Sequence, residues 1–113
     1  MSRWTIEYYE DDRGQKPVEM YIDALPIQKQ ANIFRVFELV EEFGIQLGDP
    51  YIKHIKDKIW ELRPGSERIL YFVFTGSKFV LLNGFTKKTR KTPHKEIKIA
   101  EERKRKYEAK NKL

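Results

Sequence analysis

The sequence contains no cysteine, and this absence excludes several kinds of protein. A disulfide scaffold, a thiol nucleophile and a cysteine zinc site are all ruled out. No apolar run approaches the roughly 18 residues that a membrane-spanning helix needs, and the amino-terminal residues lack the apolar core of a signal peptide. We therefore expect a cytoplasmic protein with no membrane partner.

Histidine is also scarce. The two histidines, His54 and His94, lie far apart in the sequence, and neither belongs to a histidine–carboxylate cluster at ligand spacing. We therefore expect no metal site and no cofactor. The sequence also lacks a Gly-x-x-x-x-Gly-Lys-Ser/Thr run and a Gly-x-Ser-x-Gly elbow, which excludes most nucleotide hydrolases and serine hydrolases. An enzyme with this composition would work with Lys, Arg, His, Tyr and carboxylates.

The 113 residues fit one domain, 1–113, and their 40% hydrophobic content can fill one modest core. The formal net charge of +6 is unevenly distributed. Residues 1–86 carry 11 basic and 13 acidic side chains, whereas residues 87–113 carry 12 basic and 4 acidic ones. This polarity indicates a polyanionic partner, with nucleic acid first and an acidic protein second, although a solvated tail has the same composition.

Hydrophobic periodicity predicts seven elements. We expect strands over 4–8, 59–62, 68–75 and 79–85, a helix pair over 17–25 and 27–43, and a last helix over 94–109. Pro64 and Gly65 suit the centre of a type II turn, and Thr92-Pro93 resembles a helix N-cap with a first-turn proline. The order β-α-α-β-β-β-α indicates an α+β fold with a small antiparallel sheet. Its basic carboxy-terminal helix and tail, 94–113, should dock at the start and project at the end.

The predicted sheet gathers several cations near one hairpin. Arg63 and Arg68 flank the turn between two strands, Lys87 and Lys88 follow the third strand, and His94 opens the last helix. These groups suit RNA cleavage, because RNA carries its own nucleophile in the 2′-hydroxyl. Arginine and lysine neutralise the phosphate, and histidine transfers protons near neutral pH. Turn-flanking arginines are also often merely solvated.

Three runs in this region resemble a known family. They are Trp60-Glu61-Leu62-Arg63, Arg68-Ile69-Leu70-Tyr71-Phe72-Val73 and Leu81-Leu82-Asn83-Gly84-Phe85-Thr86-Lys87-Lys88-Thr89, continued by Lys91-Thr92-Pro93, Glu96-Ile97 and Ala100. Together they look like the phage-associated HigB-type branch of the RelE/ParE toxins. The resemblance implies a RelE-like fold and the toxin of a type II toxin–antitoxin system. It also implies a metal-independent endoribonuclease that cuts messenger RNA on the ribosome.

The resemblance assigns roles to particular residues. Arg68 matches the sheet arginine that contacts the scissile phosphate, and Lys88 matches a second basic residue beyond the last long strand. His94 falls near the position of an aromatic or histidine general acid/base. Lys87, Arg63, Lys56 and Arg90 are the further candidates for binding RNA phosphates.

One position departs from the family pattern. RelE has lysines on the strand that precedes Arg68, whereas this chain has Ile59 and Glu61 there. Lys56, Lys58 or Arg63 could replace the missing charge, and Glu61 could instead act as a base.

The resemblance further implies a cognate antitoxin, a helix-turn-helix protein, as partner. The same scaffold also hosts ParE-like inhibitors of DNA gyrase, which are not nucleases, and a basic RNA-binding module is a further alternative. Fold alone does not separate these activities.

Overall fold

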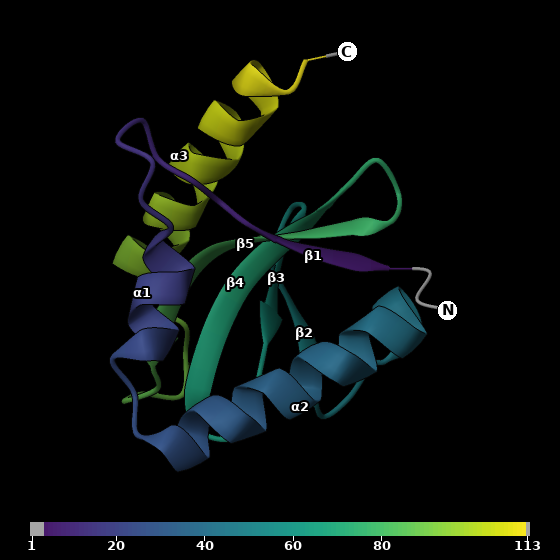
Figure 1. Ribbon diagram of the computed structural model, residues 1–113, viewed down its shortest axis with the longest axis vertical. Helices are drawn as coiled ribbons and strands as arrows, with labels where there is room; N and C mark the ends of the chain where they lie inside the picture. The colour runs from purple at the N-terminus through teal and green to yellow at the C-terminus, as the bar shows by residue number, and fades with distance from the viewer. Residues whose placement is uncertain (1–3, 113) are drawn as a thin grey trace.

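The computed structural model describes residues 4–112 and shows a five-stranded sheet with helices on both faces (Figure 1). Its elements are β1 (Thr5–Tyr8), α1 (Pro17–Asp23), α2 (Ile27–Phe43), the 3-10 helix η1 (Gly44–Gln46), β2 (Ile52–Lys56), β3 (Ile59–Leu62), β4 (Glu67–Phe74), β5 (Lys78–Thr86) and α3 (His94–Lys110). The strand order is β1-β5-β4-β3-β2. The predicted α+β class is confirmed.

Strand β4 lies at the centre of the sheet, as its apolar residues on both faces predicted. Successive side chains of a strand point to opposite faces. Ile69 accordingly packs into a core with Ile33 and other residues of α1 and α2, whereas Leu70 packs into a second core with Ala100 and Tyr107 of α3. The sheet therefore separates two hydrophobic cores, one beneath α1 and α2 and one beneath α3.

The helix pair agrees closely with the sequence pattern. Helix α2 has the predicted bounds, and α1 begins at Pro17 as expected. Gly44 follows α2 with a φ of +57°, a backbone conformation that glycine adopts without steric cost. The indole of Trp4 occupies the space that a Cβ at Gly44 would need. A glycine therefore ends α2 for two reasons, its backbone angle and its close contact with Trp4.

Two features of the sheet differ from the prediction. Strand β2 was missed, because its sequence Ile-Lys-His-Ile-Lys lacks a clean alternation and Ile52 is its one buried residue. It pairs with β3 and has a register irregularity between His54 and Lys56. Strand β1 pairs with β5 in parallel, so the sheet is mixed rather than wholly antiparallel. The pairing partner of β1 is distant in sequence and leaves no local signal.

The turn between β3 and β4 is also shifted by one residue. The N–H of Glu67 donates to the carbonyl of Pro64 at 3.2 Å, so Gly65 and Ser66 are the central residues. Gly65, with a φ of +65°, therefore occupies the first central position of this turn instead of the predicted second one.

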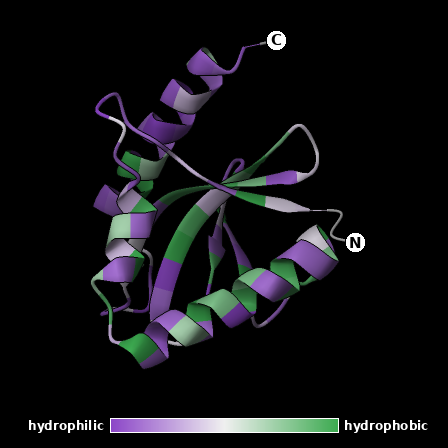
Figure 2. Cartoon of the chain, viewed as in Figure 1, coloured by the Kyte–Doolittle hydropathy of each residue, from purple (hydrophilic) through white to green (hydrophobic). Residues whose placement is uncertain are grey.

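Helix α3 packs against the sheet further along than predicted, as far as Tyr107, and residues 108–112 beyond it are exposed. Tyr107 is 4% exposed and packs edge-on against Phe72 and Phe74. Arg103 donates a hydrogen bond to the carbonyl of Leu82 at 2.8 Å. Helix α3 is largely hydrophilic (Figure 2), which is why its docking was underestimated from sequence. Ala100, Tyr107 and the aliphatic stems of basic residues suffice to bury its inner face.

Candidate functional site

A small depression lies where β3 and β5 end and β4 begins, on the face of the sheet that α3 covers. The residues that line it are Glu61, Arg63, Arg68, Phe85, Lys87, Lys88, Thr89, Arg90, Lys91, Thr92 and Pro93. The depression therefore brings together five of the cations predicted from sequence, namely Arg63, Arg68, Lys87, Lys88 and Arg90.

Strand pairing explains how residues from separate segments meet here. Glu61 lies opposite Leu70, and Arg68 lies opposite Phe85. Because side chains alternate between the two faces, Arg68 shares the face of Leu70 and therefore of Glu61. The loop after β5 is held next to them by a hydrogen bond from the N–H of Lys87 to the carbonyl of Ser66, at 2.8 Å.

Glu61 lies among cations at the floor of the depression, and its side chain is 3% exposed. Its Oε1 atom lies 3.6 Å from Nε of Arg63 and 3.8 Å from Nε of Arg68. Its Oε2 atom accepts a hydrogen bond from the hydroxyl of Thr92 at 2.7 Å. This last contact corrects the prediction for Thr92, which does not cap α3: Pro93 is the N-cap residue. A buried carboxylate needs such partners, because its desolvation is otherwise costly.

Arg68 is buried and firmly held. It is 7% exposed, and its Nη1 atom donates to the carbonyls of Gly65 at 2.6 Å and Glu67 at 2.8 Å. Burial, followed by the charge of Arg63, lowers the pKa of Arg68. The guanidinium still stays protonated, because its ordinary pKa is so high. Arg68 therefore presents a fixed positive charge at the wall of the depression.

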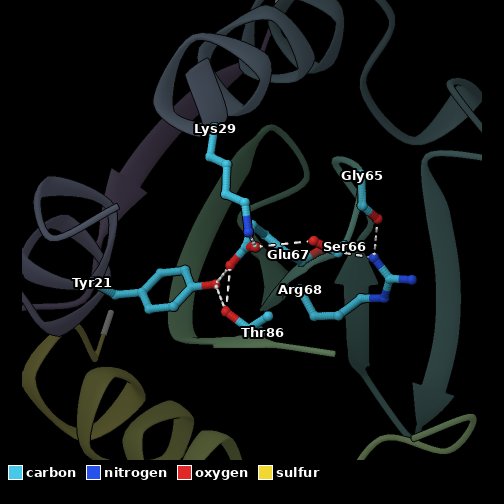
Figure 3. A network of polar contacts seen from close by, with 7 residues as sticks. All are labelled: Tyr21, Lys29, Gly65, Ser66, Glu67, Arg68 and Thr86. Carbon is cyan, nitrogen blue, oxygen red and sulfur yellow. Dashed lines mark hydrogen bonds and ion pairs between the residues drawn. The ribbon is translucent and has the colours of Figure 1, made fainter. Parts of the chain in front are cut away.

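A second buried carboxylate, Glu67, lies on the opposite face of β4 (Figure 3). The hydroxyl of Tyr21 donates to its Oε1 atom, and so does that of Thr86 at 2.7 Å. Its Oε2 atom accepts from Lys29 and Ser66, each at 3.2 Å. Burial alone raises the pKa of Glu67, but the four donated hydrogen bonds outweigh it and hold the pKa below its ordinary value.

Glu67 thereby ties α1 and α2 to the turn beneath the depression. The carbonyl groups that hold Arg68 belong to Gly65 and to Glu67 itself. Sequence reasoning missed Glu67, because the predicted strand began one residue later. A carboxylate next to an almost wholly apolar run was the available signal.

Two predicted site residues lie outside the depression. His94 is exposed at the first position of α3 and is absent from the lining of the depression. Lys56 lies on β2, and its Nζ atom pairs with Glu101 of α3 at 3.2 Å. Glu61 is the opposite case: it entered the sequence interpretation as a departure from the family pattern, and the structure places it at the centre.

The arrangement suits an anionic group. Guanidinium and ammonium groups from three segments converge around one buried carboxylate, which leaves an excess of positive charge. Within residues 4–112, no three histidine or carboxylate side chains lie close enough together to hold a metal ion. Over the same residues, no helix combines the length and the apolar character needed to cross a membrane.

Comparison with known proteins identifies the family. The model of the phage-derived Gp49-like proteins (DUF891) matches residues 20–105, about three quarters of the chain, and this stretch contains every residue of the depression. The family is associated with toxins of toxin–antitoxin systems. No curated protein matches the chain significantly. The chain therefore belongs to the Gp49-like family of phage-derived proteins.

Proposed function

We propose that this protein is the toxin of a type II toxin–antitoxin system and a metal-independent endoribonuclease that cleaves messenger RNA on the ribosome, in the cytoplasm. The observation that carries the proposal is the charge of the depression. Arg63, Arg68, Lys87, Lys88 and Arg90 converge there around a single carboxylate, as a site for a polyanion requires. The Gp49-like family membership and its association with toxins support the same class of function.

The reaction is an attack of the 2′-oxygen on the adjacent phosphorus. The P–O bond to the 5′-oxygen breaks as the new bond forms, which leaves a 2′,3′-cyclic phosphate and a 5′-hydroxyl. The proton of the 2′-hydroxyl passes to a general base, and a general acid delivers a proton to the departing 5′-oxygen. Charge accumulates on the phosphate oxygens in the transition state, so fixed cations lower the barrier.

The structure suggests how these tasks are divided. Arg68 and Lys88 stabilise the scissile phosphate, while Lys87, Arg63 and Arg90 hold the neighbouring backbone. His94 remains the candidate proton donor on the family resemblance, at the start of α3 and outside the depression. To act there, His94 must come within hydrogen-bond distance of the 5′-oxygen on the phosphate that Arg68 holds, and its neighbour Pro93 lines the depression.

Cell-free translation with the purified protein tests the proposal. Initiation complexes are assembled with Mg²⁺, treated with EDTA and then mixed with the protein. Discrete cleavage of the messenger with 2′,3′-cyclic phosphate ends supports the nuclease. Intact messenger together with accumulated gyrase–DNA breaks would assign the protein to the ParE-like inhibitors, and intact messenger with bound RNA would assign it to basic RNA-binding modules.

We further propose that a helix-turn-helix antitoxin encoded by the adjoining gene binds this protein and covers the basic depression. Co-purification of the two proteins, with loss of messenger cleavage in the complex, is the expected result. An active complex would contradict the covering of the site.

A further inference from the structure

Glu61 is the one carboxylate among the residues that line the depression, and a negative charge there opposes the binding of phosphate. The two guanidinium groups beside it, those of Arg63 and Arg68, repel each other across the floor of the site. Glu61 Oε1 lies within 4 Å of the Nε atoms of both and offsets that repulsion.

Arg63 depends on this carboxylate in particular. Its Nε atom is buried and makes no hydrogen bond with any described residue. The oxygen of Glu61 at 3.6 Å is its ion-pair partner. Arg68 has two backbone carbonyls in addition, so it is held from two sides. Removing the charge of Glu61 would therefore release Arg63 more than Arg68.

The other oxygen of Glu61 holds the loop between β5 and α3. This loop carries Lys87, Lys88 and Arg90, all exposed. It is tied to the rest of the molecule at both ends: at its start the N–H of Lys87 binds the carbonyl of Ser66, and at its end the hydroxyl of Thr92 binds Glu61. The exposed cations lie between these two attachments.

We propose that Glu61 is a positioning residue that, together with Thr92, clamps the cationic loop against Arg63 and Arg68. The clamp rests on the proposed function for its purpose, which is to set the geometry of the phosphate-binding cations. It also distinguishes Glu61 from a general base. Both of its carboxylate oxygens face protein partners and its side chain is almost fully buried, whereas a base must reach the 2′-hydroxyl.

The variant Glu61→Gln separates binding from rate. Removing a negative charge near a bound phosphate should tighten binding of a 2′-O-methyl RNA oligonucleotide about fivefold. The loss of alignment should slow cleavage of the matching RNA about a hundredfold. Glu38→Gln makes the same charge change on the exposed surface of α2, on the other face of the sheet, and should alter neither measurement. Equal losses of affinity and rate in Glu61→Gln, or no change in either, would overturn the clamp.

The Thr92 contact is tested without any cleavage assay. In Thr92→Val, the amide hydrogen of Lys87, which bonds the carbonyl of Ser66, should exchange about tenfold faster than in the wild type, because the loop loses the second of its two attachments. Thr92→Ser keeps the hydroxyl and should restore slow exchange. Thr5→Val makes the same change at an exposed position of β1 and should leave exchange of the Lys87 amide unaltered.

The two tests fail independently. If the wild-type protein cleaves no RNA, the proposed function is wrong, but the amide exchange rates still test whether Glu61 and Thr92 hold the loop. Unchanged exchange in Thr92→Val would refute the clamp even if the protein is a nuclease.

Discussion

Glu61 and Glu67 are two buried carboxylates on opposite faces of the same sheet, and their partners differ in kind. Glu67 accepts hydrogen bonds from three hydroxyl groups and one ammonium group, which come from α1, α2, the turn before β4 and the end of β5. Glu61 accepts a bond from one hydroxyl and faces two guanidinium groups at longer range. The first environment is built to hold helices on a sheet. The second offsets the repulsion between two arginines and binds the end of the loop that carries the exposed cations.

The largest expected effect is on the rate of RNA cleavage. It comes from Arg68→Ala, which removes a cation beside Glu61. Removing the fixed guanidinium should slow RNA cleavage about a thousandfold, equivalent to about 4 kcal/mol of barrier. The fold should persist, because α1, α2 and α3 pack through other residues. Cleavage is measured on a gel, and circular dichroism checks the fold. An active variant would refute Arg68 as the phosphate contact.

The next effect tests Glu67. In Glu67→Gln, the added amide hydrogens face hydroxyl donors, and Lys29 loses its ion pair, so we expect a loss of about 2 to 3 kcal/mol in the free energy of unfolding. Urea denaturation measures this loss. Glu61→Gln should cost less, about 1 kcal/mol, because Glu61 has one hydrogen bond and two ion-pair contacts at 3.6 and 3.8 Å. If both substitutions lower the free energy of unfolding equally, Glu67 and Glu61 do not differ as a structural and a positioning carboxylate.

The pH dependence of stability also distinguishes the two carboxylates. The hydrogen bonds to Glu67 depress the pKa of its carboxyl in the folded state. Such a group stabilises the fold above its unfolded pKa of about 4.3, and this stability is lost as the pH falls through the lower, folded pKa. We therefore expect the wild type to lose stability below about pH 4.3 and Glu67→Gln to show a flatter acid limb. Urea midpoints of both proteins measured from pH 7 down to pH 3 check this. If the midpoints of the wild type and of Glu67→Gln fall equally steeply below about pH 4.3, the expectation is contradicted.

The smallest effect compares a lysine inside the depression with one outside it. Lys88→Ala should weaken binding of a 2′-O-methyl RNA and reduce the slope of log affinity against log salt by about one. Lys56→Ala is the matched control, since Lys56 pairs with Glu101 away from the depression. A similar change of slope in both variants would show that binding follows net charge rather than the depression.

Much of the fold followed from local pattern. The bounds of α2 come from apolar residues at helical spacing ended by Gly44, and β4 is identified by a run that is apolar on both faces. Strand β2 and the parallel pairing of β1 could not be predicted from the local sequence. A short polar edge strand carries no periodic signal, and the pairing partner of β1 lies about 70 residues away in sequence.

The candidate site was predicted to a similar degree. Arg63, Arg68, Lys87 and Lys88 were expected together, because the residues that flank one hairpin and end a neighbouring strand meet at one end of an antiparallel sheet. His94 and Lys56 were expected with them, but they lie elsewhere. The roles of Glu61 and Glu67 required knowledge of which side chains face them across separate elements.

The sequence by itself determined how the charge is distributed: its basic last quarter predicts a polyanionic partner, and the absence of cysteine and scarcity of histidine predict no metal site. The tertiary structure decided how that charge is used. It buries the inner face of α3 through Ala100 and Tyr107 and leaves the cations of the depression around Glu61. The physical reason is that net charge is a property of composition, whereas the cost of burying a charge depends on neighbours that only the folded chain supplies.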